Sequence, residues 1–109
     1  MKYRHYHPAC ETAMFPLHQL SEACTLASEA RAAGKRVLFL ANDTAQAALS
    51  SLGEKDVLSL GATEQEIARN VYYLLHEAEE KCDLLIAIAM EEEGALVGVM
   101  NRLKKACAP

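Results

Sequence analysis

One short run of apolar residues constrains the fold of this chain more than any other feature. Residues 83–89 are almost continuously apolar, yet the run is far too short to cross a membrane. Its lack of alternating polar positions is typical of a strand that is covered on both faces, as in a parallel sheet. The segment 94–107 follows, and four of its apolar residues fall on one helical face: Leu96, Met100, Leu103 and Cys107. A buried strand that leads into an amphipathic helix predicts a β–α unit.

The rest of the chain repeats this strand-then-helix unit. The other predicted strands are 11–17, a weak strand that stops near Pro16, then 37–41 and 56–60. The other predicted helices are 18–33, 44–51 and 64–80. Alternating strands and helices imply right-handed crossovers. The sequence therefore predicts an α/β three-layer sandwich, with a mostly parallel sheet of about four strands and helices on both faces.

Finer local features accompany these elements. Four residues at the start of the chain's first helix share one face: Leu17, Leu20, Cys24 and Ala27. Thr63 and Glu66 have the spacing of a capping box, in which each side chain binds an N–H group of the other residue. Gly94 and Gly98 lie four residues apart, and we expect this spacing to let another backbone approach the last helix.

Length, composition and charge limit the possible functions. A chain of 109 residues has the length of one domain, and 51% apolar residues are enough for a core. The net charge is −4 with both signs interspersed, so we expect no direct strong binding of nucleic acid. No run approaches the roughly 20 apolar residues of a membrane span, and the polar, aromatic start is not typical of a signal peptide.

The four cysteines are Cys10, Cys24, Cys82 and Cys107, and none belongs to a C-x-x-C pair. We interpret them as small apolar residues, buried or half-buried, in a protein from a reducing compartment. This interpretation predicts a cytoplasmic location. A zinc site or a disulfide framework is the alternative interpretation.

Motifs that carry chemistry of their own are missing from the sequence. It contains no phosphate-binding P-loop, no dinucleotide-binding glycine motif and no G-x-S-x-G nucleophile motif. We therefore predict no catalytic residue and no metal site. Two loops that follow predicted strands remain candidates for a ligand, 41–43 and 90–94. Helix capping in the first loop and a solvated acidic surface in the second are the simpler explanations.

The first nine residues differ from the rest of the chain. Aromatic and cationic side chains crowd this segment, and Pro8 biases it toward an extended backbone. We interpret 1–9 as an extended arm, because tyrosine, arginine and histidine anchor interfaces and bind phosphates. A disordered tail or a plain edge strand would have the same pattern.

Two motifs, one at each end of the chain, resemble motifs of a known family. The head Lys2-Tyr3-Arg4-His5-Tyr6-x-Pro8 resembles the K/R-Y-R-H-Y-A/S-P linker that enters the C-terminal domain of two-domain threonylcarbamoyl-AMP synthases. The tail Met100-Asn101-Arg102-Leu103-Lys104-Lys105-Ala106 resembles the N-R-L-x-K-A-A end of the same domain. The two motifs bracket the whole chain at the separation typical of the family. The chain departs from the family pattern at His7, Leu96 and Cys107.

This resemblance implies a division of the chain and a role for each motif. It implies a linker arm at 1–9 and a Rossmann-like accessory domain at 10–109. Five arm residues would link the domains and gate the active site of the synthase: Tyr3, Arg4, His5, Tyr6 and Pro8. The tail residues Asn101, Arg102 and Leu103 would be structural.

The resemblance also implies a function and a partner. Family members make threonylcarbamoyl-AMP from threonine, bicarbonate and ATP, and the product is used to modify an adenosine in tRNA. Catalysis belongs to a separate N-terminal domain, which would hold the ATP and a divalent cation, so no cofactor is expected in this chain. The expected partner is that catalytic domain, in the same chain or in another. The residues alone leave two alternatives open: an independent Rossmann-like module for a nucleotide or small effector, and a structural subunit that associates through a sheet edge or the arm.

Overall fold

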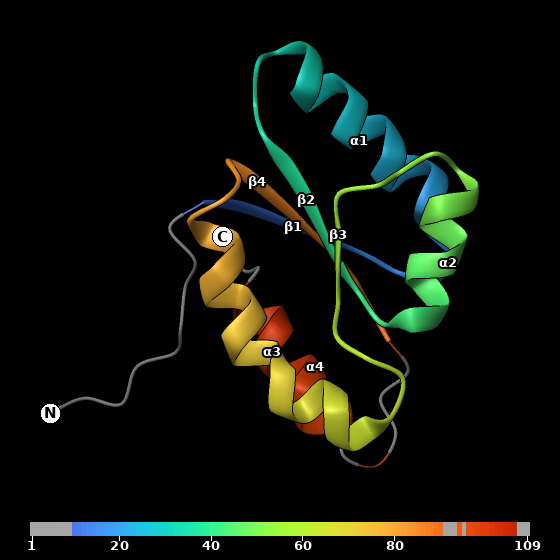
Figure 1. Cartoon of the computed structure of the whole chain (residues 1–109), viewed down its shortest axis with the longest axis vertical. Helices are drawn as coiled ribbons and strands as arrows, with labels where there is room; N and C mark the ends of the chain where they lie inside the picture. The colour runs from blue at the N-terminus through green and yellow to red at the C-terminus, as the bar shows by residue number, and fades with distance from the viewer. Residues whose placement is uncertain (1–9, 91–93, 95, 107–109) are drawn as a thin grey trace, which may run out of the picture.

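The structure is a computed structural model that describes residues 10–90, 94 and 96–106. Four strands alternate with four α-helices in this part of the chain (Figure 1). The strands are β1 (Glu11–Phe15), β2 (Val37–Ala41), β3 (Val57–Ser59) and β4 (Leu84–Ile88). The helices are α1 (Leu20–Ala32), α2 (Asp43–Ser51), α3 (Glu64–Glu79) and α4 (Leu96–Ala106), and a 3-10 turn, η1 (Leu17–Gln19), precedes α1.

The four strands form one parallel sheet in the order β1-β4-β2-β3. β4 lies between β1 and β2, and its residue Leu84 is in register with Glu11 on one side and Val37 on the other. All five residues of β4 are buried, as expected for a strand with neighbours on both sides and helices on both faces. β1 forms one edge of the sheet and pairs with β4 alone.

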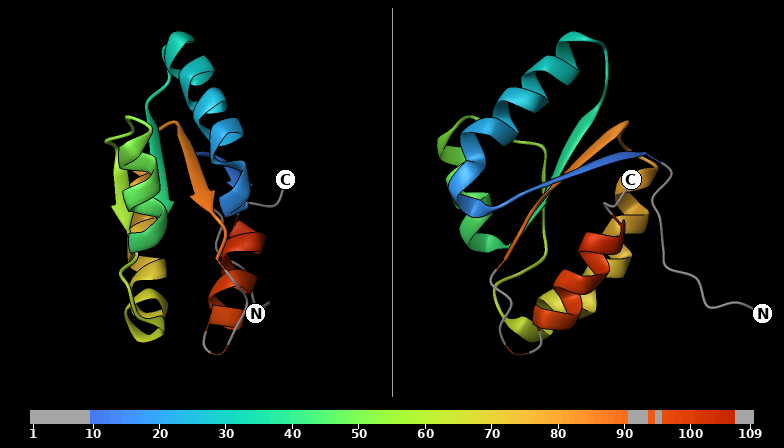
Figure 2. Two further views of the ribbon diagram at one scale, coloured as in Figure 1. Left: turned by 90° about the vertical axis from the view of Figure 1, so that its right-hand side faces the viewer. Right: turned by 180° about the vertical axis from the view of Figure 1, so that it is seen from behind.

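Helices cover both faces of the sheet. α1 and α2 lie on one face and α3 and α4 on the other, as the front and rear views show (Figures 1 and 2). α3 and α4 contact each other. The α1–α2 face buries Phe39 and Ile86, whereas the α3–α4 face buries Leu40 and Leu85. Each such side chain stabilises the fold by about 1.5–3 kcal/mol relative to an exposed position. The predicted three-layer α/β sandwich is confirmed, and none of the described helices is long and apolar enough to cross a membrane.

The helix starts follow the capping signals in the sequence. The hydroxyl of Thr63 accepts a hydrogen bond from the Glu66 N–H at 3.1 Å, and the Glu66 carboxylate accepts one from the Thr63 N–H at 3.1 Å. The predicted capping box is therefore confirmed. The N–H groups of Ala62 and Thr63 that donate to the Glu66 carboxylate lower its pKa. At α2, the side-chain oxygen of Asn42 accepts from the Ala45 N–H at 2.9 Å.

The expected apolar face of the first helix is confirmed only in part, since Ala27 is buried and Leu20 and Cys24 pack against the core, but Leu17 does not belong to the face. Ala23, Ala27 and Ala30 are the buried residues of α1, so this helix packs closely on the sheet through small side chains. Leu17 lies in the preceding 3-10 turn with 46% of its surface exposed. Leu20 and Cys24 lie only half-buried beside the α1–α2 face of the core.

The expectation for the last two glycines is wrong. Gly98 is exposed on α4, and a Cβ atom added there would meet nothing within 4 Å. Gly94 has a different reason to be glycine: its φ of +54° lies in the left-handed region, and the Glu64 carboxylate occupies the space of a Cβ. In α4 itself, Val99, Met100 and Leu103 are buried and Leu96 is half-buried, while Cys107 lies outside the described residues.

Candidate functional site

A pocket of about 680 Å³ lies at the carboxyl edge of the sheet. Its walls come from the segments that directly follow β1, β2 and β4, namely Pro16, Leu17, His18, Asn42, Thr44, Ala45, Ala89 and Met90, together with Leu96 of α4. The chain leaves β1 and β2 toward the α1–α2 face but leaves β4 toward the opposite face. Crevices where neighbouring connections diverge in this way are the usual ligand sites of open α/β sheets.

The lining of this pocket is mixed in character. Leu17, Met90 and Leu96 supply apolar surface, and His18 and Thr44 supply polar groups. The pocket can therefore hold a small molecule that has both apolar and polar parts. Two of the sequence-predicted loops meet here, because Asn42 and Met90 follow neighbouring parallel strands.

Other described residues of those two loops do not line the pocket. The carboxylate of Asp43 turns instead to the hydroxyl of Ser59, which donates to it at 2.5 Å. Residues 91–93 lie outside the described residues. The sequence did not identify Leu17 and His18 as pocket residues, because both were assigned to the first helix or to its start. Pro16, directly after β1, was the only signal for a turn at this position.

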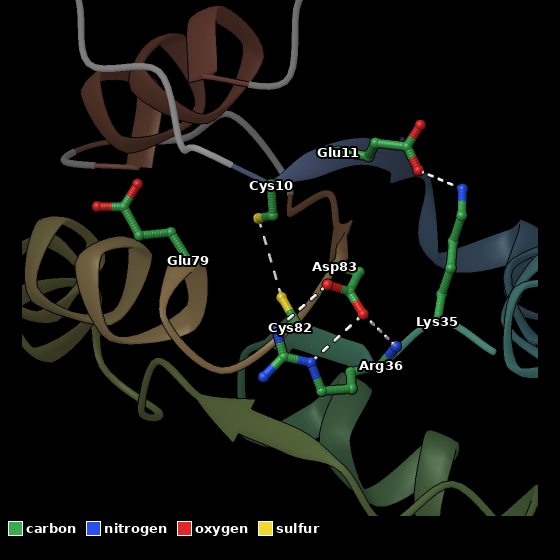
Figure 3. Close-up of a pocket in the computed structure, with 7 residues that line it drawn as sticks. All are labelled: Cys10, Glu11, Lys35, Arg36, Glu79, Cys82 and Asp83. Carbon is green, nitrogen blue, oxygen red and sulfur yellow. Dashed lines mark hydrogen bonds and ion pairs between the residues drawn. The ribbon is translucent and has the colours of Figure 1, made fainter.

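A second, charged depression of about 470 Å³ lies at the opposite, amino edge of the sheet (Figure 3). Asp83 and Arg36 dominate it: the Asp83 carboxylate accepts from the Arg36 backbone N–H at 2.8 Å and from the guanidinium at 3.2 and 3.3 Å. These bonds lower the pKa of Asp83 and raise that of Arg36. Lys35 donates to the Glu11 carboxylate at 2.5 Å.

Two cysteines line the same depression. The Sγ atoms of Cys10 and Cys82 lie 3.8 Å apart (Figure 3). Cys82 is 2% exposed and Cys10 and Cys24 are half-buried, which confirms their interpretation as buried or half-buried thiols in the described part of the chain. Burial raises the pKa of all three thiols, that of Cys82 to about 12. Among residues 10–90, 94 and 96–106, no three histidine, cysteine or acidic side chains are grouped to hold a metal ion.

The tail motif lies on α4. Leu103 is fully buried in the core between α3, α4 and the sheet. The guanidinium carbon of Arg102 lies 5.0 Å from the centre of the Tyr72 ring on α3, a cation–π contact that joins the two helices. Asn101 is exposed. The predicted arm residues, Tyr3, Arg4, His5, Tyr6 and Pro8, lie outside the described residues.

Comparison with known proteins places the chain in a family. A family model described as the C-terminal domain of threonylcarbamoyl-AMP synthase matches residues 1–108. The chain belongs to this family. It is 34% identical over 110 residues to the threonylcarbamoyl-AMP synthase of Pyrococcus abyssi (strain GE5 / Orsay), and this match covers 97% of the chain and 30% of that protein.

A solved structure agrees with the family assignment. The crystal structure of P. abyssi Sua5 complexed with L-threonine matches the chain with a TM-score of 0.76 and 32% identity. The match covers 98% of this chain and 31% of that one, so the chain spans about a third of the length of the relatives it matches. The resemblance drawn from the head and tail motifs and the expected Rossmann-like α/β fold are confirmed. The family match also includes residues 1–9.

Proposed function

We propose that this chain is the accessory domain of a threonylcarbamoyl-AMP synthase and supports the formation of threonylcarbamoyl-AMP from threonine, bicarbonate and ATP. The observation that carries the proposal is the family match over residues 1–108 of a chain that spans only about a third of its relatives. The partner is the catalytic domain of the synthase, in the same chain or in another. The product serves the threonylcarbamoylation of adenosine in tRNA.

The arm gives this proposal its mechanism. The head motif that contains Tyr3, Arg4, His5 and Tyr6 resembles the linker of the family, and we assign to these residues the gating of the catalytic pocket. Arg4 suits a phosphate of the nucleotide, because its planar guanidinium donates two parallel hydrogen bonds to two oxygens. Tyr3 and Tyr6 supply rigid surface that excludes water from a closed site.

The chemistry itself is assigned to the partner. ATP and the divalent cation bind in the catalytic domain, and the accessory domain contributes no ligand to the cation. A cytoplasmic location fits the three thiols of the described region, Cys10, Cys24 and Cys82, because buried thiols persist in reducing compartments.

The test joins this chain, with residues 1–9 intact, to the catalytic domain of a synthase that lacks its own C-terminal domain. Pyrophosphate release that depends on threonine and bicarbonate is then measured. We expect the joined protein to release pyrophosphate faster than the bare catalytic domain. Arg4→Ala should lower kcat/KM by about 10- to 150-fold, since a charge-assisted bidentate contact contributes about 1.5–3 kcal/mol.

The matched control is Arg69→Ala, which removes an exposed arginine on α3. The activity of this variant should equal that of the unchanged joined protein. Equal rates for the bare and the joined catalytic domain, with the accessory part folded by circular dichroism, would contradict the proposal.

A second candidate function rests on the pocket at the carboxyl edge. Its position between diverging connections and its mixed lining favour a small effector bound by the domain itself. Thermal shift of the chain against ATP, AMP, pyrophosphate and threonine tests this function. A stabilising ligand should lose its effect when Leu17→Glu places a charge in the pocket wall, and the absence of any shift across the panel counts against the effector.

A further inference from the structure

A pair of cysteines meets where the chain enters the sheet (Figure 3). Cys10 directly precedes β1, and Cys82 lies two residues before β4, the neighbour of β1. A backbone hydrogen bond from Glu11 N to Asp83 O, at 3.0 Å, fixes the two strand starts against each other. The 3.8 Å between the two Sγ atoms is therefore held by the sheet and not by the side chains alone.

This geometry is close to that of a disulfide. The β1–β4 register continues with Cys10 opposite Asp83, so Cys82 is offset from Cys10 by one residue along the strands. A strand spacing of about 4.8 Å and a rise of about 3.3 Å per residue give a Cα–Cα separation of roughly 6 Å, inside the range of about 4.4–6.8 Å found in disulfides. The sulfur atoms need to approach by roughly 1.8 Å to reach bonding distance. Rotation of the two side chains covers such a movement, so the bond can form without moving either strand.

The two thiols differ in access. Cys10 is half-buried and faces the charged depression, whereas Cys82 is 2% exposed and its Sγ lies 3.1 Å from the carbonyl oxygen of Ala78. A reagent in solution therefore reaches Cys10 first. Burial raises the pKa of both thiols, which slows their reaction with bulk reagents at neutral pH. Because the second sulfur is so near, a Cys10–Cys82 disulfide is favoured over a lasting mixed disulfide on one cysteine.

We propose that Cys10 and Cys82 are an oxidative modification site, at which a low-molecular-weight disulfide converts the two thiols into an intramolecular disulfide. The Cys10 thiolate attacks one sulfur of the small disulfide, forms a mixed disulfide and releases one small thiolate. The deprotonated Cys82 then attacks Cys10 Sγ, forms the Cys10–Cys82 bond and releases the second thiolate. The protein loses two electrons and two protons, which appear in two small thiols.

The bond would fasten an edge strand. β1 pairs with β4 alone, and Cys10 directly follows residues 1–9 in the sequence. A disulfide between residues so far apart in the chain restricts the unfolded state and stabilises the fold. The disulfide therefore anchors the start of β1, the first described strand, to the start of β4. The site does not depend on the synthase activity proposed above.

The test uses the double variant Cys24→Ser/Cys107→Ser, in which only the proposed pair remains. The chain is incubated with oxidised glutathione at about pH 8.5, where a larger fraction of the thiols is ionised than at neutral pH, then quenched in acid, and its mass is measured by mass spectrometry. We expect a loss of about 2 Da without a glutathione adduct, and a Tm that rises by about 10 °C and returns to its first value with dithiothreitol.

Single variants separate the two roles. Adding Cys82→Ala to the double variant leaves Cys10 without its partner, so a persistent glutathione adduct on Cys10 supports the proposal. Adding Cys10→Ala should leave Cys82 unmodified in the folded chain. A glutathione adduct that persists with both cysteines present, or no change in mass after prolonged incubation of the folded chain, overturns it.

Discussion

Asp83 and Arg36 hold the amino ends of β4 and β2 together through bonds in both directions. The Asp83 carboxylate accepts from the backbone N–H of Arg36 at 2.8 Å, while the Arg36 carbonyl oxygen accepts from the Asp83 N–H at 2.8 Å. The guanidinium adds two further contacts to the carboxylate. These contacts lie directly before Val37 and Leu84, the first pair of the two central strands, and support the register of that pair.

This arrangement predicts a pH dependence of stability. Arg36 lowers the pKa of Asp83 through hydrogen bonds, and Lys35 adds a smaller favourable charge. A carboxylate whose pKa is lower in the folded state contributes stability above its unfolded pKa of about 4, and this stability is lost as the pH falls through the folded value. Glu11 and Glu79 also line the depression, so two further acidic side chains lie near this pair.

The measurement compares urea unfolding of the chain and of Asp83→Asn between about pH 2 and pH 7. We expect the variant to be less stable at neutral pH, and the difference between the two proteins to shrink as the pH falls below about 4. A difference that stays constant over this range would show that the charge of Asp83 contributes nothing.

The capping box of α3 should be measurable on its own. Thr63→Ala removes the acceptor of the Glu66 N–H and should lower the free energy of unfolding by about 1 kcal/mol. Thr63→Ser keeps the hydroxyl and is the matched control, with little change expected. Equal losses for alanine and serine would point to the methyl group of Thr63 and not to its cap.

The alanine face of α1 predicts an intolerance of larger side chains. Ala27 is fully buried between α1 and the sheet, so Ala27→Leu should destabilise the chain by about 1–3 kcal/mol through overpacking. Ala32→Leu places the same side chain on the exposed side of α1 and should leave stability nearly unchanged. Denaturant unfolding of both variants decides the matter, and equal stability of the two would contradict the close packing of this helix.

The buried carboxylate of Glu54 depends on Arg31, which lies in the last turn of α1. Glu54 is 7% exposed, and Arg31 Nη1 lies 2.9 Å from its Oε1 in an ion pair without hydrogen-bond alignment. Arg31→Ala should cost about 1–3 kcal/mol of stability, because it leaves a buried charge without its counter-ion. The double variant Arg31→Ala/Glu54→Leu should recover most of this loss. No recovery in chemical unfolding would argue against a buried charge as the cause.

Much of the fold could be predicted because the apolar runs are short and clearly bounded. The second strand was predicted at its observed residues, 37–41, since polar residues flank five apolar ones. The Thr63 cap was equally clear. The buried face of α1 was predicted only in part, because the crossover from β1 to β2 decides which side of the helix meets the sheet. At that close approach alanine fits, and the leucines that suggested the other face lie at its margin.

The candidate sites were harder to predict because each depends on strand order. Asn42 and Met90 were recognised as residues at strand ends, but only the order β1-β4-β2-β3 brings them into one pocket. The contact of Cys10 with Cys82 has the same origin, since β1 and β4 are the first and last strands in the chain. No local pattern near either cysteine marks the other as its neighbour.

The most direct measurement of the proposed accessory role is made on tRNA from a strain whose synthase retains only its catalytic domain. This chain is joined to that domain through its own residues 1–9, and the content of threonylcarbamoyladenosine in tRNA is measured by mass spectrometry of nucleosides. We predict that the content rises well above that of the strain with the bare catalytic domain. An unchanged content, with the joined protein present and folded, would contradict the role.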